Sequence, residues 1–153
     1  MKKSILIIIV IFVLLSGCLS TGSSYTAGNN SSNPEPKKIN LKGLTFLTEV
    51  EPALLLAKVQ GKPVFVYARS EYCGACKLFE SESFTNKSVI EKLNKNFILI
   101  SIDVDDQRTE TRNFKIRVTP TEIFLDPNGT ELKRIHGYRT NQTFLAEINN
   151  IVK

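Results

Sequence analysis

The stretch VFVYARSEYCGAC, residues 64–76, decides the fold of this chain. Residues 64–68 form an apolar run of the kind found in strands that are covered on both faces. Cys73 and Cys76 follow three positions apart, where helix signals resume. A thiol at the start of a helix gains from the free backbone N–H groups there, because these favour its thiolate. The stretch therefore predicts a strand-to-helix junction that carries two thiols.

The cysteine pair has three possible uses: thiol–disulfide exchange, a static disulfide, or half of a metal site. A zinc site needs about four ligands, and only His136 remains as a plausible soft ligand once Cys18 is set aside. We therefore expect no metal, and no cofactor other than a redox-active disulfide between Cys73 and Cys76. Cys73 comes first and is predicted to attack, and Cys76, about one helical turn further in, is predicted to resolve the mixed disulfide.

The rest of the chain alternates helix and strand signals. Helices are predicted from about Val50 to the stop at residues 61–63, from the cysteines through Glu80, over 89–93 after a cap at Asn86, over 108–114, and over 144–152 with Asn141 as a candidate cap. Strands are predicted over 64–68, 97–102, 121–125 and 131–136, the last two joined by a turn at 126–129. Helices between the early strands indicate parallel pairing, and the late hairpin indicates antiparallel pairing.

The first residues have the pattern of a targeting signal. Lys2 and Lys3 precede an unbroken apolar run, 5–15, which is short for a membrane span. The box Leu15-Ser16-Gly17-Cys18 that follows resembles a bacterial-type lipoprotein signal. This resemblance implies cleavage before Cys18 and conversion of its thiol to a lipid thioether, which leaves one pair of free cysteines. The alternatives are a plain signal peptide or an uncleaved anchor.

Residues 18–38 are rich in Ser, Thr, Gly, Asn and Pro and are predicted to form a lipid-anchored disordered linker. Such a linker reaches about 25 Å. Residues 39–153 then have the size of one domain, which we expect to be a monomer. The formal net charge of +5 would fall to +3 without Lys2 and Lys3. No basic stripe is interleaved with aromatic residues, so a nucleic-acid partner is not expected.

The order of elements, with Cys-X-X-Cys at a strand-to-helix junction and Val118-Thr119-Pro120 before a late strand, resembles the thioredoxin fold. The fold class is thus α/β, with a central mixed sheet flanked by helices on both faces. The segment CGACKLFE, 73–80, is similar to the periplasmic thioredoxin-like domain of the DsbD-type transmembrane reductases and their stand-alone relatives. Phe84 and the segment NKSV, 86–89, extend this similarity.

The resemblance implies a substrate-binding surface around the cysteines. Pro120 matches the family's cis-proline, whose loop lies against the cysteine pair and pairs with a bound peptide. Thr119 would then touch the sulfur, and Tyr72 would shield the thiol, meet the partner or simply pack. Gly74 and Ala75 are small and leave the sulfur accessible.

The sequence departs from cytoplasmic thioredoxins at two places. Tyr67 stands where they carry a buried acid, and Ser101 stands where they carry a lysine. Glu71 and Glu80 flank the motif, and either could relay a proton. The simpler expectation is that both are solvated charges at a helix end.

These features predict a membrane-tethered, extracytoplasmic thiol–disulfide oxidoreductase that reduces the disulfides of exported proteins. A membrane thiol-electron transporter would recharge the pair. An oxidase or isomerase would use the same chemistry in the other direction, which depends on the reduction potential. A non-catalytic binding lipoprotein with the same fold is the alternative from another class.

Overall fold

The two apolar runs of the sequence form the central strands of the protein. In the computed structural model, which describes residues 35–152, these are β3 (Val64–Arg69) and β4 (Ile98–Asp103), paired in parallel as predicted. All six residues of β3 and the first five of β4 are buried. The second strand begins one residue later than predicted, because Phe97 ends the preceding helix with its N–H on the Leu93 carbonyl.

The late hairpin is also confirmed. β5 (Thr121–Leu125) pairs antiparallel with β3, and β6 (Glu131–His136) pairs antiparallel with β5. Asp126 organises the turn between them, because its carboxylate accepts hydrogen bonds from the backbone N–H groups of Asn128 and Thr130, both at 2.8 Å.

A second hairpin was not predicted. β1 (Lys38–Leu41) and β2 (Leu44–Leu47) pair antiparallel, and β2 joins β4 through the parallel pair Leu47 and Ile100. The sheet of the described part of the chain thus has the strand order β1-β2-β4-β3-β5-β6. β1 starts one residue before the predicted domain boundary. The turn of this hairpin reaches the end of a helix, since the N–H of Gly43 donates to the Phe84 carbonyl at 3.0 Å.

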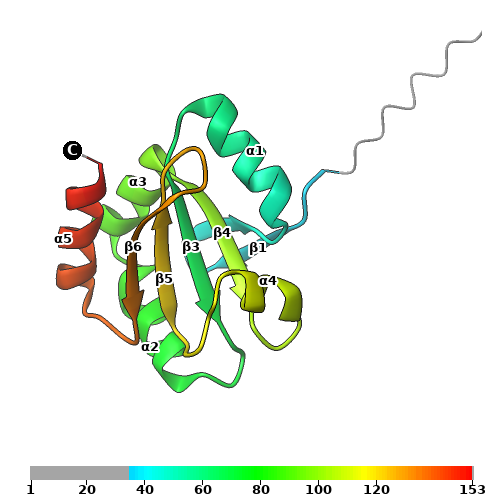
Figure 1. Ribbon diagram of the computed structural model, residues 1–153. Helices are drawn as coiled ribbons and strands as arrows, with labels where there is room; N and C mark the ends of the chain where they lie inside the picture. Colours follow the sequence, from blue (N-terminus) through cyan, green and yellow to red (C-terminus); the bar gives the residue numbers. More distant parts are fainter. Residues whose placement is uncertain (1–34, 153) are drawn as a thin grey trace, which may run out of the picture. The chain divides into compact units, whose positions relative to one another are not determined.

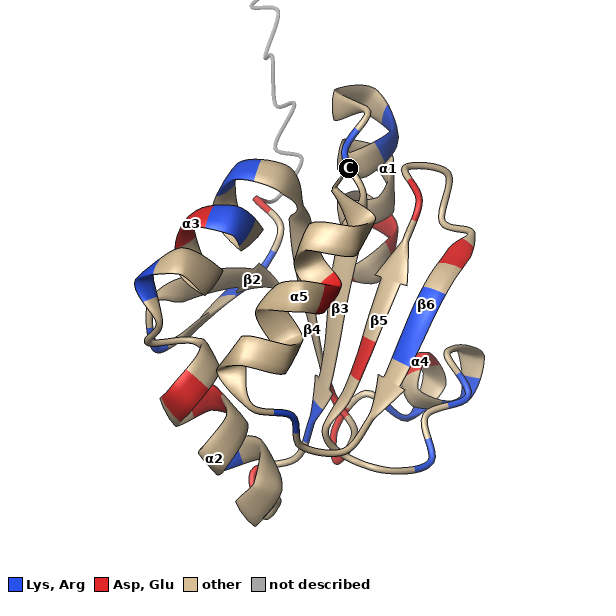
Figure 2. Cartoon of the chain, turned by 90° about the vertical axis from the view of Figure 1, so that its left-hand side faces the viewer, with Lys and Arg blue, Asp and Glu red and all other residues tan. Residues whose placement is uncertain are grey.

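Helices cover both faces of the sheet (Figure 1). One face carries α1 (Val50–Gln60) and α4 (Arg108–Asn113), and the other carries α2 (Gly74–Ser83), α3 (Lys87–Asn96) and α5 (Asn141–Ile151). Figure 2 looks onto this second face, with α5 in front of the central strands. The thioredoxin fold predicted from the sequence is therefore present.

The helix caps test the sequence prediction in detail. Asn86 caps α3 as expected, with its side chain accepting from the N–H groups of Ser88 and Val89 at 3.0 and 3.2 Å. The cap predicted at Asn141 is wrong: Thr140 precedes α5, and its hydroxyl accepts from the Thr143 N–H. Both residues are short polar side chains suited to a cap, and the backbone places the earlier one in the extended conformation that a cap needs.

The two faces have different cores. Aliphatic side chains fill the α1 and α4 face, whereas aromatic rings dominate the other. Phe65 is central to the aromatic face, with ring centroids of Phe124 and Phe144 at 5.2 and 5.4 Å. Tyr67 and Phe79 continue this cluster, at 5.7 Å from each other, towards the cysteine motif. The motif thus lies at the edge of a rigid aromatic core.

Cys18 and the predicted signal lie outside the described residues, as does nearly all of the predicted linker. Within residues 35–152, no helix has both the length and the apolar character needed to cross a membrane.

Candidate functional site

The loop between β3 and α2 holds the cysteine motif in place. Ser70 is buried, and its hydroxyl donates to the Asp105 carboxylate at 2.7 Å and accepts from the Tyr72 N–H at 3.1 Å. The Cys73 N–H donates to the Ser70 carbonyl at 3.2 Å. These bonds fix the loop to the end of β4, so the motif is anchored to two strands.

Cys73 and Cys76 are joined by a disulfide, with their Cα atoms 5.2 Å apart. Cys73 is the residue before the first turn of α2, and its Sγ accepts a hydrogen bond from the Cys76 N–H at 3.0 Å. It is half-buried, whereas Cys76 is fully buried. A sulfur in this position faces the positive end of the helix, where negative charge is stabilised. Cys73, predicted to attack, is therefore the more exposed residue of the pair.

The other residues of the motif lie at the surface. Gly74 and Ala75 are exposed, and a Cβ added at Gly74 would meet no atom within 4 Å. The Tyr72 side chain is 88% exposed, so it does not pack into the core. The residues on either side of Cys73 are therefore exposed.

The loop before β5 lies at the same end of the sheet as the motif (Figure 1). The Thr119–Pro120 peptide bond is cis, as predicted. Pro120 is buried and its carbonyl accepts from the Gly137 N–H at 2.8 Å, while Thr119 is partly exposed. Thr121 follows Pro120 and pairs with Ala68 near the end of β3. The sheet thus brings the two predicted parts of the site, 72–76 and 119–120, to one edge.

A buried polar network lies under the first turns of α2. The Tyr67 hydroxyl donates to Glu80 Oε1 at 3.1 Å and lies 3.4 Å from the Cys76 carbonyl oxygen. Arg69 donates to Glu80 Oε1 and to Asp103 Oδ2, both at 3.0 Å. Burial, and then the charge of Glu80, raises the pKa of the Tyr67 hydroxyl well above its usual value. Tyr67 therefore acts here as a neutral hydrogen-bond donor.

This network corrects one expectation. Glu80 is not a solvated charge at a helix end: its side chain is 8% exposed and forms an ion pair with Arg69. Its neighbour in the motif, Glu71, is exposed as expected. Sequence reasoning could not foresee this difference, because it depends on Arg69 at the end of β3 reaching across to α2.

The sequence analysis also missed Glu122 in β5. This side chain is fully buried, and within residues 35–152 neither carboxylate oxygen has a hydrogen-bond partner. Burial raises its pKa to about 8. The signal available in the sequence was a single acidic residue inside the apolar strand 121–125.

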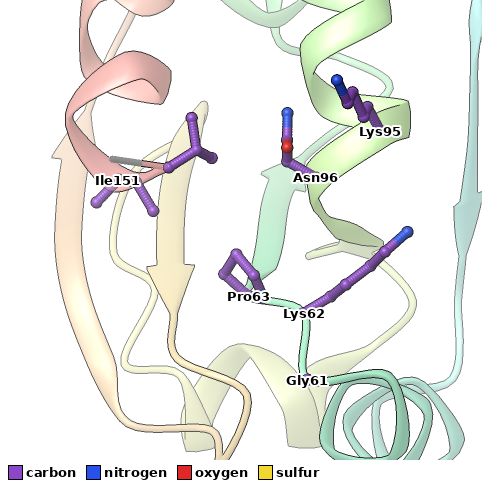
Figure 3. Close-up of a pocket in the computed structure, with 7 residues that line it drawn as sticks. Gly61, Lys62, Pro63, Lys95, Asn96 and Ile151 are labelled. Atoms are coloured by element: carbon purple, nitrogen blue, oxygen red, sulfur yellow. The ribbon is translucent and has the colours of Figure 1, made fainter.

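In the described part of the chain, two hollows have no cysteine in their lining. A cavity of about 360 Å³ is lined by Pro63 and Ile151 among others (Figure 3). Pro63 precedes β3, so this cavity lies at the opposite end of the sheet from the motif. A larger groove of about 1010 Å³ runs between α1 and α4 and includes Arg69 and Glu71 on its wall. No group of three or more His, Cys, Asp or Glu side chains in residues 35–152 is arranged to hold a metal ion.

The fold and the Cys-X-X-Cys motif together define a thiol–disulfide oxidoreductase of the thioredoxin type. Comparison with known families gives the same result, since the model of the thioredoxin-like domain matches residues 50–151. The chain belongs to this family.

Within this broad family, the chain is similar to particular proteins. The chain is similar to the "Thiol:disulfide interchange protein DsbD" of Haemophilus ducreyi, at 29% identity over 157 aligned residues, and of Yersinia pestis, at 31% over 129. These alignments cover 99% and 80% of the chain but only 27% and 21% of the relatives. The chain therefore spans about a quarter of their length.

Solved structures agree on the fold. A thioredoxin from Thermus thermophilus superposes with a TM-score of 0.61 at 29% identity, covering 68% of this chain and 84% of that one. A poplar thioredoxin h superposes with a TM-score of 0.58 at 24% identity, covering 67% and 87%.

Proposed function

We propose that this protein is a membrane-tethered, extracytoplasmic thiol–disulfide oxidoreductase that reduces disulfides in exported proteins. The observation that carries the proposal is the hydrogen bond from the Cys76 N–H to Cys73 Sγ, 3.0 Å long, at the open start of α2. In the reduced protein, the same N–H and the helix dipole would stabilise a thiolate on Cys73.

The reaction follows from the unequal exposure of the two cysteines. The Cys73 thiolate attacks one sulfur of the client disulfide, that S–S bond breaks, and the first client thiolate leaves and takes a proton from solvent. The Cys76 sulfur then gives up its proton and attacks Cys73 Sγ. The Cys73–Cys76 disulfide forms, the second client thiolate is released, and two electrons have passed to the client.

Client binding is assigned to the edge of the sheet around Cys73. Tyr72 is exposed beside Cys73, Gly74 and Ala75 leave room for the client chain, and the backbone of Thr119, just before Pro120, is available for pairing with an extended peptide. Val118, 49% exposed, would add apolar contact on the same loop.

Tethering rests on residues 1–38. Cys18 carries the lipid in this proposal, and residues 18–38 serve as the linker to the domain. A membrane thiol-electron transporter recharges the pair, an assignment supported by the name of the DsbD relatives, which are thiol:disulfide interchange proteins. Labelling with a radioactive fatty acid, compared between the wild type and Cys18→Ser, tests the anchor.

A reduction assay with insulin tests the chemistry. We expect the reduced protein to precipitate insulin chains in the presence of a thiol donor, and Cys73→Ser to abolish this. Full activity of that variant would refute the mechanism. Cys76→Ala should accumulate mixed disulfides through Cys73, which mass spectrometry of the trapped species would locate and whose clients it would identify.

The direction of electron transfer between the protein and its clients is decided by a separate measurement. An equilibrium titration of the pair against glutathione gives the reduction potential. A potential below that of the compartment supports reduction of clients, and a higher one supports the oxidase or isomerase alternative. Client binding that survives the loss of both cysteines, with thiols that do not turn over, would support the binding lipoprotein instead.

A further inference from the structure

Glu122 is a buried acid that the reaction described so far does not use. Its side chain is fully buried in β5, and both carboxylate oxygens lack a hydrogen-bond partner in the part of the chain that the structure describes. Leaving a buried polar group without a partner destabilises a fold. An apolar residue at this position would make the folded protein more stable. The presence of a carboxyl group therefore needs an explanation.

The position of Glu122 points to the cysteine motif. It lies two residues after Pro120 and pairs in register with Tyr67. Opposed side chains on neighbouring antiparallel strands lie on the same face, with Cβ atoms about 5 Å apart. Tyr67 extends from there to the first turn of α2, where its hydroxyl lies 3.4 Å from the Cys76 carbonyl oxygen. The Tyr67 side chain therefore connects the position of Glu122 in β5 to the first turn of α2, which carries the buried Cys76.

The other charged groups of this region have partners. Tyr67 and Arg69 of β3 both donate to Glu80 of α2. Arg69 also reaches Asp103.

The polar and charged groups on the flanking elements also have partners. On the β6 and α5 side, Lys133 is bonded to Glu147, and before α5 the Tyr138 hydroxyl donates to Glu82 of α2 at 2.6 Å. Arg139 is the remaining cation that acts on Glu122, and it is exposed.

Glu122 is therefore the buried carboxyl group of this region that has no hydrogen-bond partner among residues 35–152. Burial raises its pKa to about 8 in the disulfide form. The charge of Arg139 opposes part of this rise, as does the nearby backbone N–H of Glu122 itself, although that N–H makes no well-formed hydrogen bond to the carboxylate. The acid consequently holds its proton at neutral pH when the cysteines are oxidised.

We propose that Glu122 shares one proton with the buried thiol of Cys76 and so activates Cys76 for the resolving step. The inference rests on the proposed thiol–disulfide exchange. Two neighbouring anions in a buried space are disfavoured, so a thiolate and a carboxylate there take turns in holding one proton.

The step balances as follows. In the mixed disulfide, Cys76 passes its proton to the Glu122 carboxylate and its sulfur attacks Cys73 Sγ. The Cys73–Cys76 bond forms, the bond from Cys73 to the client breaks, and the client leaves as a thiolate. When a reductant later reopens the disulfide, Cys76 leaves as a thiolate and recovers the proton from Glu122. Glu122 takes the proton of the attacking sulfur, so it is the general base of this step, and it touches no client.

The two attacks can be timed separately. Reduced protein is mixed with excess aromatic disulfide whose released thiolate is coloured. The first release reports the attack by Cys73 and depends on reagent concentration; the second reports the attack by Cys76 and does not. For Glu122→Gln we expect the first rate to stay within about two-fold, and the second to fall about a hundred-fold at pH 7, at the low end of proton-transfer effects.

The pH profile separates this role from a structural one. In the wild type the second rate should follow a group that is missing from the profile of Glu122→Gln, and Glu122→Asp should restore part of the rate. Glu91→Gln, at an exposed position of α3, is the matched control and should change neither phase. An unchanged second phase and pH profile in Glu122→Gln would overturn the proposal.

A second measurement uses the wild-type protein alone, so it does not depend on whether a variant folds. The infrared carbonyl band of a protonated carboxyl group should titrate near pH 8 in the oxidised wild type and shift when the cysteines are reduced. Absence of such a band, or a band that ignores the redox state, also overturns the proposal. Failure of the proposed function itself would look different, since neither coloured phase would then depend on Cys73.

Discussion

The unpaired carboxyl group of Glu122 makes the stability of the oxidised protein depend on pH. Its pKa is about 8 in the folded protein and 4.5 in the reference state. Because the folded value is the higher one, the folded state binds the proton more tightly than the unfolded state. The resulting stability is fully present below pH 4.5 and is lost as the pH rises through 8.

The magnitude follows from linkage. Each pH unit between the two pKa values lowers the free energy of unfolding by about 1.4 kcal/mol. Between about pH 5 and pH 8, where the folded group is half ionised, the loss amounts to about 3 kcal/mol. That is a large part of the stability of an ordinary domain, which is about 5–15 kcal/mol.

Glu122→Gln isolates this contribution. The amide is also buried without a partner, but its cost is the same at every pH, so only the slope changes. Unfolding by urea, followed by circular dichroism on the oxidised proteins at both pH values, should show the variant gaining about 3 kcal/mol relative to wild type between pH 5 and 8. Glu91→Gln should run parallel to wild type, because Glu91 is exposed.

If the free energy of unfolding changed equally with pH in wild type and Glu122→Gln, the reasoning would be refuted. They would mean that Glu122 is ionised, and compensated, in the folded protein throughout this range. The result does not depend on any redox activity, so it tests the buried acid separately from its proposed partnership with Cys76.

Three further predictions concern the support of the site. Arg69→Met leaves Glu80 buried without its ion-pair partner and should lower the free energy of unfolding by about 3–5 kcal/mol in urea titrations. Phe124→Ala removes a fully buried ring from the aromatic core, so a loss of about 3–5 kcal/mol is expected by the same assay, and a loss below 1 kcal/mol would contradict the packing described. Asn86→Ala removes the cap of α3 and should reduce stability by about 1 kcal/mol, whereas Asn86→Ser should recover most of it.

Much of the fold could be predicted because its signals are local. The apolar run at 64–68, the turn at 126–129 and the breaker at 61–63 each depend on neighbouring residues. Gly61 indeed ends α1 in the left-handed conformation, with φ 63°. The cis bond before Pro120 was predicted from the family resemblance, and it is present.

The parts that escaped prediction depend on contacts between distant residues. The β1–β2 hairpin has two strands of four residues each, too short for a periodic signal, and β2 is fixed by pairing with β4 some fifty positions later. α3 runs over Lys87–Asn96, longer than the predicted 89–93, because its polar ends carry no apolar pattern.

The candidate site divides in the same way. The positions of Cys73 and Cys76 at the start of a helix could be predicted from their spacing and from the strand before them. The burial of Glu80 and Glu122 could not, because Arg69 and Tyr67 lie on another element and only the folded sheet brings them close. A charged residue inside an apolar strand, as at Glu122, is nevertheless a signal that sequence analysis can use.

The unpredicted hairpin bears on where a self-sufficient folding unit begins. The family match starts at residue 50, beyond β2. Yet Phe46 packs its ring against Phe84 with centroids 5.4 Å apart, and Gly43 donates to the Phe84 carbonyl at the end of the helix whose other end carries the cysteines. A Cβ on Gly43 would come within 2.5 Å of Ile90 Cδ1, so the turn of the hairpin packs closely against α3. A recombinant fragment that starts at the family boundary would lose the hairpin and these contacts. Such a fragment should begin before Lys38 instead.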